Sequence, residues 1–211
     1  RTVEISNLNF AYPDSMVKVL NNICLTLPQN GLVLVKGISG SGKSTLLKIL
    51  SGNLVIKDGS VSVNENANNW SMQWLRANSS YMNQFPFIFD GTLHYNVFLD
   101  ETTDVNRPYP RFLDKILAKK EEQWQTVLSH NGKQLSGGEK QLVTLARMML
   151  YPKPIAILDE PTANLDPDTA DIIIEQISDL SKHTLCIVAS HEEKFEANAT
   201  TILNLNWGEQ I

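Results

Sequence analysis

The stretch Gly37-Ile38-Ser39-Gly40-Ser41-Gly42-Lys43-Ser44-Thr45 decides how the rest of the chain is interpreted. Its spacing is G-x-x-x-x-G-K-S, the pattern of a phosphate-binding loop. The apolar run Leu32 to Val35 before it predicts a buried strand, and the apolar residues from Leu46 to Leu50 follow at helical spacing. Between a strand and a helix, backbone N–H groups and the helix dipole converge on a polyphosphate. An ordinary Gly/Ser-rich turn is the alternative, and the flanking strand and helix argue against it.

Two side chains of this loop have distinct expected roles. The ammonium of Lys43 supplies a positive charge for the β- and γ-phosphates of a nucleotide, and the hydroxyl of Ser44 is suited to ligate Mg²⁺. The residues that we expect to surround the phosphates are Gly37, Ser39, Gly40, Ser41, Gly42, Lys43, Ser44 and Thr45.

Length and composition set broad limits on the protein. At 211 residues, 42% of them hydrophobic, the chain can bury a substantial core and is predicted to form one domain. The net charge of −5, the pI of about 5.4 and the lack of a basic block argue against a nucleic-acid partner. No apolar run reaches the roughly 18 residues of a membrane span, and no signal peptide is visible. Because the chain opens on Arg1 directly in a strand pattern, we interpret it as a piece of a longer polypeptide.

The two cysteines, Cys24 and Cys186, both lie in apolar, strand-like runs. Neither has a second cysteine or a histidine at the spacing of a metal site. We therefore expect both to be reduced thiols in the core of a cytosolic domain.

Short apolar runs alternate with segments of helical periodicity along most of the chain. The expected strands lie at residues 3–10, 23–27, 32–35, 59–63, 79–82, 155–158 and 185–189, and the expected helices at 46–50, 136–150 and 170–180. The alternation predicts an α/β fold with a P-loop core, in which a mostly parallel sheet is covered by other elements on both faces. The first two strands are joined across a turn at Tyr12 to Ser15.

The segment from Thr92 to Leu135 differs from the strand-like runs before it in the spacing of its apolar residues. Its apolar residues recur at helical intervals among Lys and Glu, and those on which the prediction rests are Ile116, Leu117, Trp124, Val127 and Leu128. We expect a small helical insertion here. With the helix that follows, it forms a helical subdomain of about residues 92–150 within a single domain spanning residues 1–211.

Three polar residues follow the ends of apolar strands. Asp159 and Glu160 close the run at 155–158, and His191 follows the run at 185–189. Ligands of parallel sheets bind beyond the carboxyl ends of the strands, so these side chains are expected beside the phosphate loop. There, Asp159 can hold Mg²⁺, usually through its water shell, and Glu160 can orient or deprotonate an attacking water. Without a phosphate loop in the chain, the simpler interpretation would be that Asp159 and Glu160 are solvent-exposed carboxylates of an ordinary loop.

A second stretch, Leu135-Ser136-Gly137-Gly138-Glu139-Lys140-Gln141, places a serine and two glycines at the start of a helix. This is another anion site, which a chain with one nucleotide does not need. Two chains that face each other head to tail do need it, since each could close the nucleotide site of the other. At this point the chain resembles the ABC ATPase family, the nucleotide-binding domains that power ABC transporters. The resemblance runs from about Val3 to Leu205.

The resemblance implies roles for individual positions. It matches the Walker A loop at 37–45, the Walker B strand at 155–160, the family signature at 135–141 and the D-loop at 163–166. Gln84 looks like the Q-loop glutamine, which touches Mg²⁺ and the attacking water. His191 looks like the switch histidine on the γ-phosphate, and Tyr12 looks like the aromatic residue on which adenine stacks. ATP and Mg²⁺ are thus the implied cofactors, and an N-terminal antiparallel β subdomain is the implied addition to the core.

Two segments resemble the exporter branch of the family. Phe87 to Leu93 is similar to the segment after the Q-loop, and Thr126 to Gly132 is similar to the X-loop, which touches the transmembrane domains. The chain departs from the pattern at His130 and Asn131, where exporters usually carry Glu and Arg. Leu142 also replaces the usual arginine after the signature.

The resemblance implies an ATPase domain of an ABC transporter of exporter type, on the cytoplasmic face of the membrane. Its implied catalytic residues are Glu160, His191, Gln84 and Lys43, its metal ligands are Ser44, Gln84 and Asp159, and its partner-facing residues are Ser136, Gly137 and Gly138. The implied partners are a second nucleotide-binding domain and transmembrane domains in the same polypeptide, without nucleic acid. The alternatives are a nucleotide-gated interaction module and a soluble ABC ATPase of DNA repair or translation.

Overall fold

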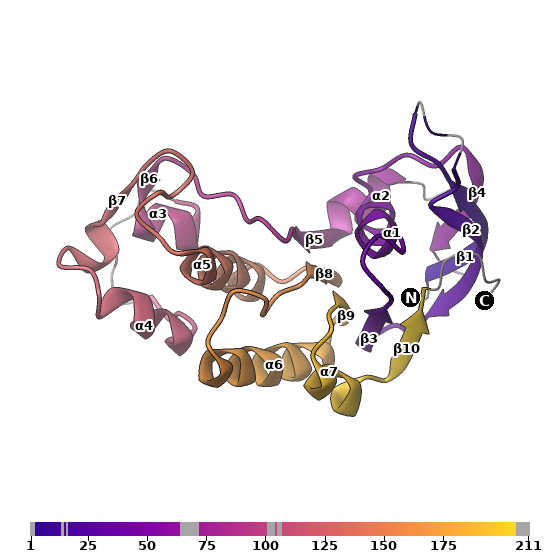
Figure 1. The fold of residues 1–211 in the computed structure, drawn as a ribbon. Helices are drawn as coiled ribbons and strands as arrows, with labels where there is room; N and C mark the ends of the chain where they lie inside the picture. The colour runs from indigo at the N-terminus through magenta and orange to yellow at the C-terminus, as the bar shows by residue number, and fades with distance from the viewer. Residues whose placement is uncertain are drawn as a thin grey trace.

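The centre of the molecule is a five-stranded, wholly parallel sheet, seen in a computed structural model that describes residues 3–13, 15, 17–63, 72–100, 104 and 107–205 (Figure 1). The strand order is β10-β3-β9-β8-β5, and all four neighbouring pairs are parallel. The strands are β3 (Gly31–Lys36), β5 (Ser79–Met82), β8 (Ile155–Asp159), β9 (Leu185–Ala189) and β10 (Thr201–Asn204). Their carboxyl ends therefore share one edge of the sheet, which confirms the expected α/β class.

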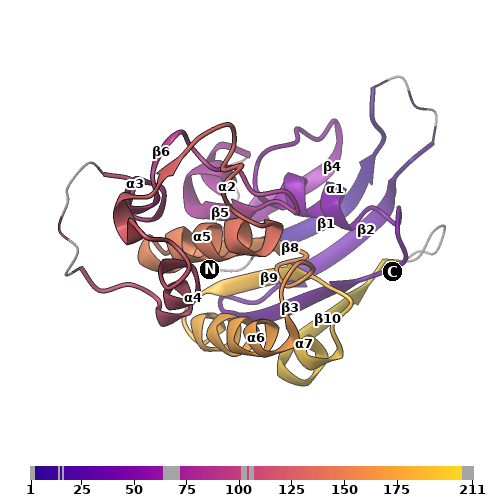
Figure 2. The ribbon, with the colours of Figure 1, turned by 60° about the vertical axis from the view of Figure 1, so that its left-hand side comes forward.

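Side chains on the two faces of this sheet enter two separate apolar cores. Leu32 and Leu34 of β3 pack with α5 (Gly137–Leu150), α6 (Pro167–Ser181) and α7 (Glu193–Asn198). Val33 and Val35 pack with α1 (Lys43–Leu50) and the N-terminal strands. Figure 2 shows the sheet between α1 on one side and α6 and α7 on the other. Burial on both faces explains why these strands are continuously apolar rather than alternating.

A three-stranded antiparallel sheet of order β2-β1-β4 adjoins α1. Its strands are β1 (Val3–Phe10), β2 (Leu20–Leu27) and β4 (Asp58–Val63). The register of β1 shifts in the region of Ser6 to Asn9, where Asn7 has a φ of 48°. This sheet is the antiparallel β subdomain that the family resemblance implied.

The prediction of two core thiols is wrong for Cys24 and correct for Cys186. Side chains of β2 alternate across the strand, and this places Cys24 on the exposed side, where its Sγ accepts the N–H of Asn7 at 3.3 Å. Cys186 of β9 is fully buried, and desolvation raises the pKa of its thiol to about 12. A parallel central strand buries both faces, whereas β2 buries one.

The segment between β5 and α5 is a group of short elements around a small aromatic core. It contains β6 (Gly91–Thr92), α3 (Leu93–Phe98), a 3₁₀ turn at Arg111–Leu113, α4 (Asp114–Leu117), a second 3₁₀ turn at Gln123–Gln125 and β7 (Val127–Leu128). The expected helical run through Trp124, Val127 and Leu128 is wrong, since β7 pairs antiparallel with β6. Trp124 instead packs against the ring of Phe98, at 5.5 Å between centroids. This tertiary packing overrides the local helical spacing.

Two helices were not expected. They are α2 (Met72–Asn78), which precedes β5, and α7, which precedes β10, and their buried residues are Leu75 and Phe195 respectively. A single buried position does not produce a readable helical period, so the sequence pattern was too weak to reveal either helix. None of the helices in the described part of the chain has the length and hydropathy that a bilayer-spanning helix needs.

Candidate nucleotide-binding site

A cavity of about 550 Å³ opens at the carboxyl edge of the parallel sheet. Its wall includes residues that follow β3, β5, β8 and β9, which are far apart in the sequence. The lining residues are Tyr12, Val19, Ser39, Gly40, Gly42, Lys43, Ser44, Thr45, Gln84, Asp159, Glu160, Ala163 and His191. Of the expected site residues, Gly37 and Ser41 lie outside this lining, as do Ser136, Gly137 and Gly138.

The backbone of the loop explains two of its glycines. Gly42 precedes α1 with a φ of 99°, in the left-handed region that L side chains rarely adopt. A Cβ on Gly37 would lie 2.4 Å from both the Leu205 carbonyl oxygen and the Ser41 hydroxyl. Gly37 and Ser41 therefore form the packed underside of the loop, while Ser39, Gly40 and the residues from Gly42 to Thr45 face the cavity.

Lys43 begins α1 and is largely buried at the mouth of the loop. Its Nζ donates to the carbonyl oxygens of Gly37 at 2.7 Å and Ile38 at 3.2 Å. The ammonium is thus held over the loop by neutral acceptors. A phosphate oxygen in the cavity would be a charged and therefore stronger acceptor for the same donor.

Asp159 is 3% exposed at the end of β8, and its Oδ2 accepts a hydrogen bond of 3.5 Å from the Tyr81 hydroxyl. Burial, followed by the charge of Asp159, raises the pKa of Tyr81. Among the described residues no cluster of three or more His, Cys, Asp or Glu could hold a metal ion. Asp159 does share the cavity with the Ser44 hydroxyl and the Gln84 amide, which are oxygen donors of the kind that Mg²⁺ takes alongside phosphate. These residues therefore fit Mg²⁺ bound together with a nucleotide.

Glu160 follows Asp159 in a left-handed conformation, with a φ of 51°. Its N–H donates to the Ala189 carbonyl at 2.9 Å, and its side chain is 18% exposed. Burial is the main cause that raises the pKa of this carboxyl, and the nearby charges of His191 and Lys43 partly oppose it. Nε2 of His191 lies 3.6 Å from Oε1 of Glu160. A carboxylate with a raised pKa and a free approach from the cavity has the properties of a general base.

Tyr12 contributes an aromatic side chain to the lining of the cavity. Its hydroxyl is 3.1 Å from the Thr45 hydroxyl, and the Phe10 ring contacts it edge-on at 5.1 Å. The side chain remains partly exposed, at 39%. The ring is therefore held in place by α1 and β1 while part of it stays open to a planar ligand.

Gln141, which is fully buried on α5, makes contacts that its place in the sequence pattern did not predict. Its amide donates to the Glu160 carbonyl at 3.2 Å, and its oxygen accepts the N–H of Asn164 at 3.3 Å. Gln141 thus joins the signature helix to the catalytic candidate and to the segment after it. The available signal was a glutamine on the buried face of an amphipathic helix.

Ser136 to Gly138 form the start of α5, away from the cavity. The Ser136 hydroxyl accepts the Glu139 N–H at 3.2 Å, and the Glu139 carboxylate accepts the Ser136 N–H at 2.9 Å, which is a capping box. Gly138 packs on the segment after β8, since a Cβ there would lie 2.5 Å from the Asn164 carbonyl oxygen. Ser136 and Gly137 are exposed, so this helix start is accessible to another molecule.

Comparison with known proteins gives a consistent answer. The family model described as ABC transporter matches residues 20–163. A probable ABC transporter ATP-binding/permease protein of Haemophilus influenzae is 31% identical over 98% of this chain and 38% of its own length. The multidrug resistance-like ATP-binding protein MdlB of Buchnera aphidicola is 31% identical over 99% of the chain and 37% of its own.

The comparison with solved structures points to the same family as the sequence comparisons. A bacterial Atm1-family ABC exporter with ATP bound superposes with a TM-score of 0.84 at 25% identity, over 100% of this chain and 38% of the exporter chain. The chain thus spans less than two fifths of the length of each of these relatives. It belongs to the ABC transporter family and is similar to the nucleotide-binding domains of the family's exporters.

Proposed function

We propose that the chain hydrolyses ATP in the cavity at the carboxyl edge of its sheet and so drives a membrane exporter. The observation that carries this proposal is the meeting of Lys43, Asp159, Glu160 and His191 around one cavity. Phosphoryl transfer requires mainly positioning and charge stabilisation, and these side chains supply both. Mg²⁺ held near Ser44, Gln84 and Asp159 would neutralise phosphate charge.

The candidate site residues have separate roles in the proposed reaction. The Tyr12 ring stacks on the adenine, and the backbone N–H groups of the loop hold the phosphates. Lys43 transfers its hydrogen bonds from the loop carbonyls to phosphate oxygens. Glu160 accepts the proton of the attacking water, and His191, which lies beside it, contacts the γ-phosphate. Gln84, which lines the same cavity, orients the same water.

A second nucleotide-binding domain completes the site. Ser136, Gly137 and Gly138 lie outside their own chain's cavity, on an exposed helix start that can bind an anion. In a head-to-tail pair each helix start would contact the nucleotide of the other chain. In this arrangement the starts of both α1 and α5 would bind the phosphates of a nucleotide.

An aromatic surface on the segment after β5 would receive the transmembrane domains. Phe85, Phe87 and Phe89 are between 40% and 78% exposed. Surface aromatics gathered in this way are typical of a protein interface. Because the relatives are an ATP-binding/permease protein and an ABC exporter, we place the chain at the cytoplasmic face of the membrane, as part of a polypeptide that also carries those domains.

The chain's own polar contacts connect that surface to the signature helix. The Arg147 guanidinium on α5 lies 5.0 Å from the Phe89 ring centroid and donates to the Phe87 carbonyl at 3.0 Å. The Asn131 side chain, in the segment similar to the X-loop, accepts the Ile88 N–H at 2.8 Å. These contacts would couple the aromatic surface to the helical subdomain of about residues 92–150, which we propose lies within a single domain.

A phosphate-release assay with Glu160→Gln tests the proposal. The variant should bind ATP normally and hydrolyse it about 10²- to 10⁴-fold more slowly, because it lacks the proton acceptor. Glu192→Gln is the matched control, since it removes a neighbouring exposed carboxylate and should keep its activity. A Glu160→Gln variant with full turnover, or a wild-type chain with none, would contradict the proposal.

A further inference from the structure

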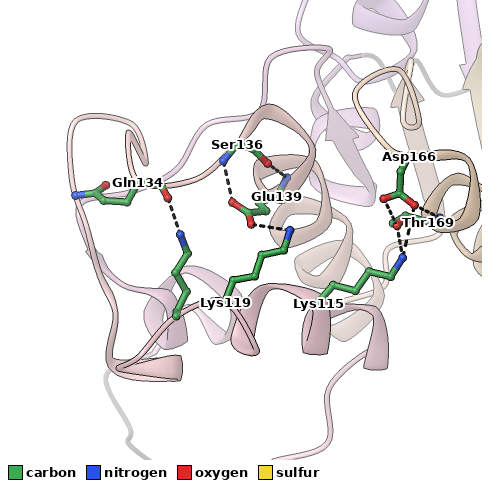
Figure 3. Close-up of polar contacts among 8 residues, drawn as sticks. Lys115, Lys119, Gln134, Ser136, Glu139, Asp166 and Thr169 are labelled. Atoms are coloured by element: carbon green, nitrogen blue, oxygen red, sulfur yellow. Dashed lines mark hydrogen bonds and ion pairs between the residues drawn. The ribbon is translucent and has the colours of Figure 1, made fainter.

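The short helix α4 and the turn after it direct three lysines toward segments that would face a second chain (Figure 3). Lys115 contacts Asp166 and Thr169 at the start of α6. Lys120 donates to the Gln134 carbonyl at 2.8 Å. The third, Lys119, lies with its Nζ 3.7 Å from Oε1 of Glu139.

The pair between Lys119 and Glu139 has an electrostatic consequence. Glu139 stands in the first turn of α5, and its side chain is only 12% exposed, so water screens its charge poorly. It uses Oε2 to accept the Ser136 N–H and turns Oε1 toward Lys119. A carboxylate at this position stabilises the helix start, yet it also repels any anion that the same helix start would bind.

The helix start itself retains donors for an anion. The N–H groups of Gly137 and Gly138 have no acceptor within the helix, as for the first residues of any α-helix. The Ser136 hydroxyl oxygen accepts the Glu139 N–H, so the hydroxyl hydrogen can still be donated. Three donors therefore compete with one nearby negative charge, and Lys119 is the cation that contacts that charge.

We propose that Lys119 is a positioning residue that neutralises Glu139 and so keeps the start of α5 able to bind the nucleotide phosphate of a second chain. The inference rests on the proposed function, in which Ser136 to Gly138 close the partner's site. Lys119 itself does not line its own chain's cavity. Its loss should therefore weaken pairing of the chains without weakening nucleotide binding by a single chain.

The test measures dimer dissociation at saturating MgATP by sedimentation velocity, in the Glu160→Gln background to prevent hydrolysis. Lys119→Met should weaken the dimer about two- to fivefold at each of two sites, the range of exposed ion pairs. Lys119→Arg should restore it. Lys182→Met, which breaks a similar exposed pair with Asp179, should have no effect. Binding of a fluorescent ATP analogue to the monomer should be unchanged in all variants.

A double-mutant cycle separates charge neutralisation from ordinary packing. Glu139→Gln keeps the capping box, because glutamine can accept the same N–H, but it removes the charge. If Lys119 acts by neutralising Glu139, Lys119→Met should have no effect in the Glu139→Gln chain. An equal effect in both backgrounds, or none in either, overturns the inference while the dimer still forms. A parent chain that does not dimerise with MgATP overturns the shared-site model as well.

Discussion

At the scale of single residues, the site depends on side chains whose properties are set by their surroundings. A glutamate can ionise wherever it lies in a protein, but the burial of Glu160 in the wall of the cavity raises its pKa. Tyr12 would be an ordinary turn residue without the Thr45 hydroxyl and the Phe10 edge that hold its ring. Each of these properties can be tested by a substitution that changes one side chain.

The raised pKa of Glu160 gives a prediction about stability. The folded state favours the protonated carboxyl of Glu160, because its pKa is raised by folding. The protonated group therefore contributes its full stabilisation below about pH 4.3, the pKa of a free glutamate. This stabilisation is lost as the pH rises through the higher pKa of the folded state. Glu160→Gln, which cannot ionise, should therefore gain stability relative to wild type across that window. Urea unfolding of both chains at several pH values measures this difference. A difference that stays constant, or falls, as pH rises would contradict it.

Tyr12 is expected to contribute affinity without chemistry. Tyr12→Ala should raise the KM for ATP by the equivalent of about 1–3 kcal/mol, as for other base–aromatic stacking. Tyr12→Trp should largely preserve it, because either ring offers a face. Since the contact is the same in the ground and transition states, kcat should change little. Steady-state kinetics decide the matter, and an equal fall in kcat would remove the stacking role.

At the scale of elements, α5 connects the two surfaces on which the proposed function depends. Its start carries the signature, Gln141 holds the Glu160 carbonyl, and Arg147 holds the segment after β5. Burial lowers the pKa of Arg147 to about 10, so it remains charged at neutral pH. A single helix therefore touches the proposed partner surface, the backbone of Glu160 after β8 and the aromatic surface.

The contacts of Gln141 should matter to both stability and turnover. Gln141→Leu removes two hydrogen bonds at a fully buried position and should cost about 1–3 kcal/mol of unfolding free energy. It should lower kcat more than it raises KM, since Gln141 lies outside the cavity. Gln176→Leu, at an exposed position of α6, should change stability by less than about 0.5 kcal/mol. Denaturant unfolding and steady-state kinetics test both, and a neutral Gln141→Leu would refute the role.

At the scale of the whole molecule, the proposed function requires two incomplete anion sites on each chain rather than one complete site. The cavity contains Lys43 and the catalytic candidates, while Ser136 and its glycines stand on a separate exposed surface. Two chains facing each other would bring the two kinds of surface together twice.

Mixing two inactive variants tests whether the site is shared. Lys43→Ala disables a chain's own phosphate loop, and Ser136→Arg disables the surface that it offers to its partner, so each preparation alone should be nearly inactive. A heterodimer of the two contains one intact site and one doubly damaged site. Activity of the mixture should therefore exceed the sum of the separate preparations and depend on total concentration.

Two controls accompany the mixing experiment. Affinity-tagged chains show whether heterodimers form, and nucleotide trapping detects a restored site even if the two sites are strongly coupled. Formed heterodimers without rescue in either assay would leave the shared-site model unsupported.

The phosphate loop, the buried strands and the acidic pair after β8 could be predicted because each depends on local order along the chain. A strand–loop–helix unit requires residues at fixed spacing, and strands buried on both faces must be apolar throughout. The α/β class and the family follow from these patterns. The roles of Glu160, His191 and the signature remain predictions until they are measured.

Tertiary packing alone decided the rest. Trp124 and β7 do not form the expected helix, because Trp124 packs in an aromatic core and β7 pairs with β6. Cys24 is exposed because only one face of its strand is buried. The Gln141 bridge and the pair between Lys119 and Glu139 join segments that no local spacing relates. Such contacts depend on which elements lie side by side, so a single sequence can predict the loop that binds a phosphate but not the neighbours that tune it.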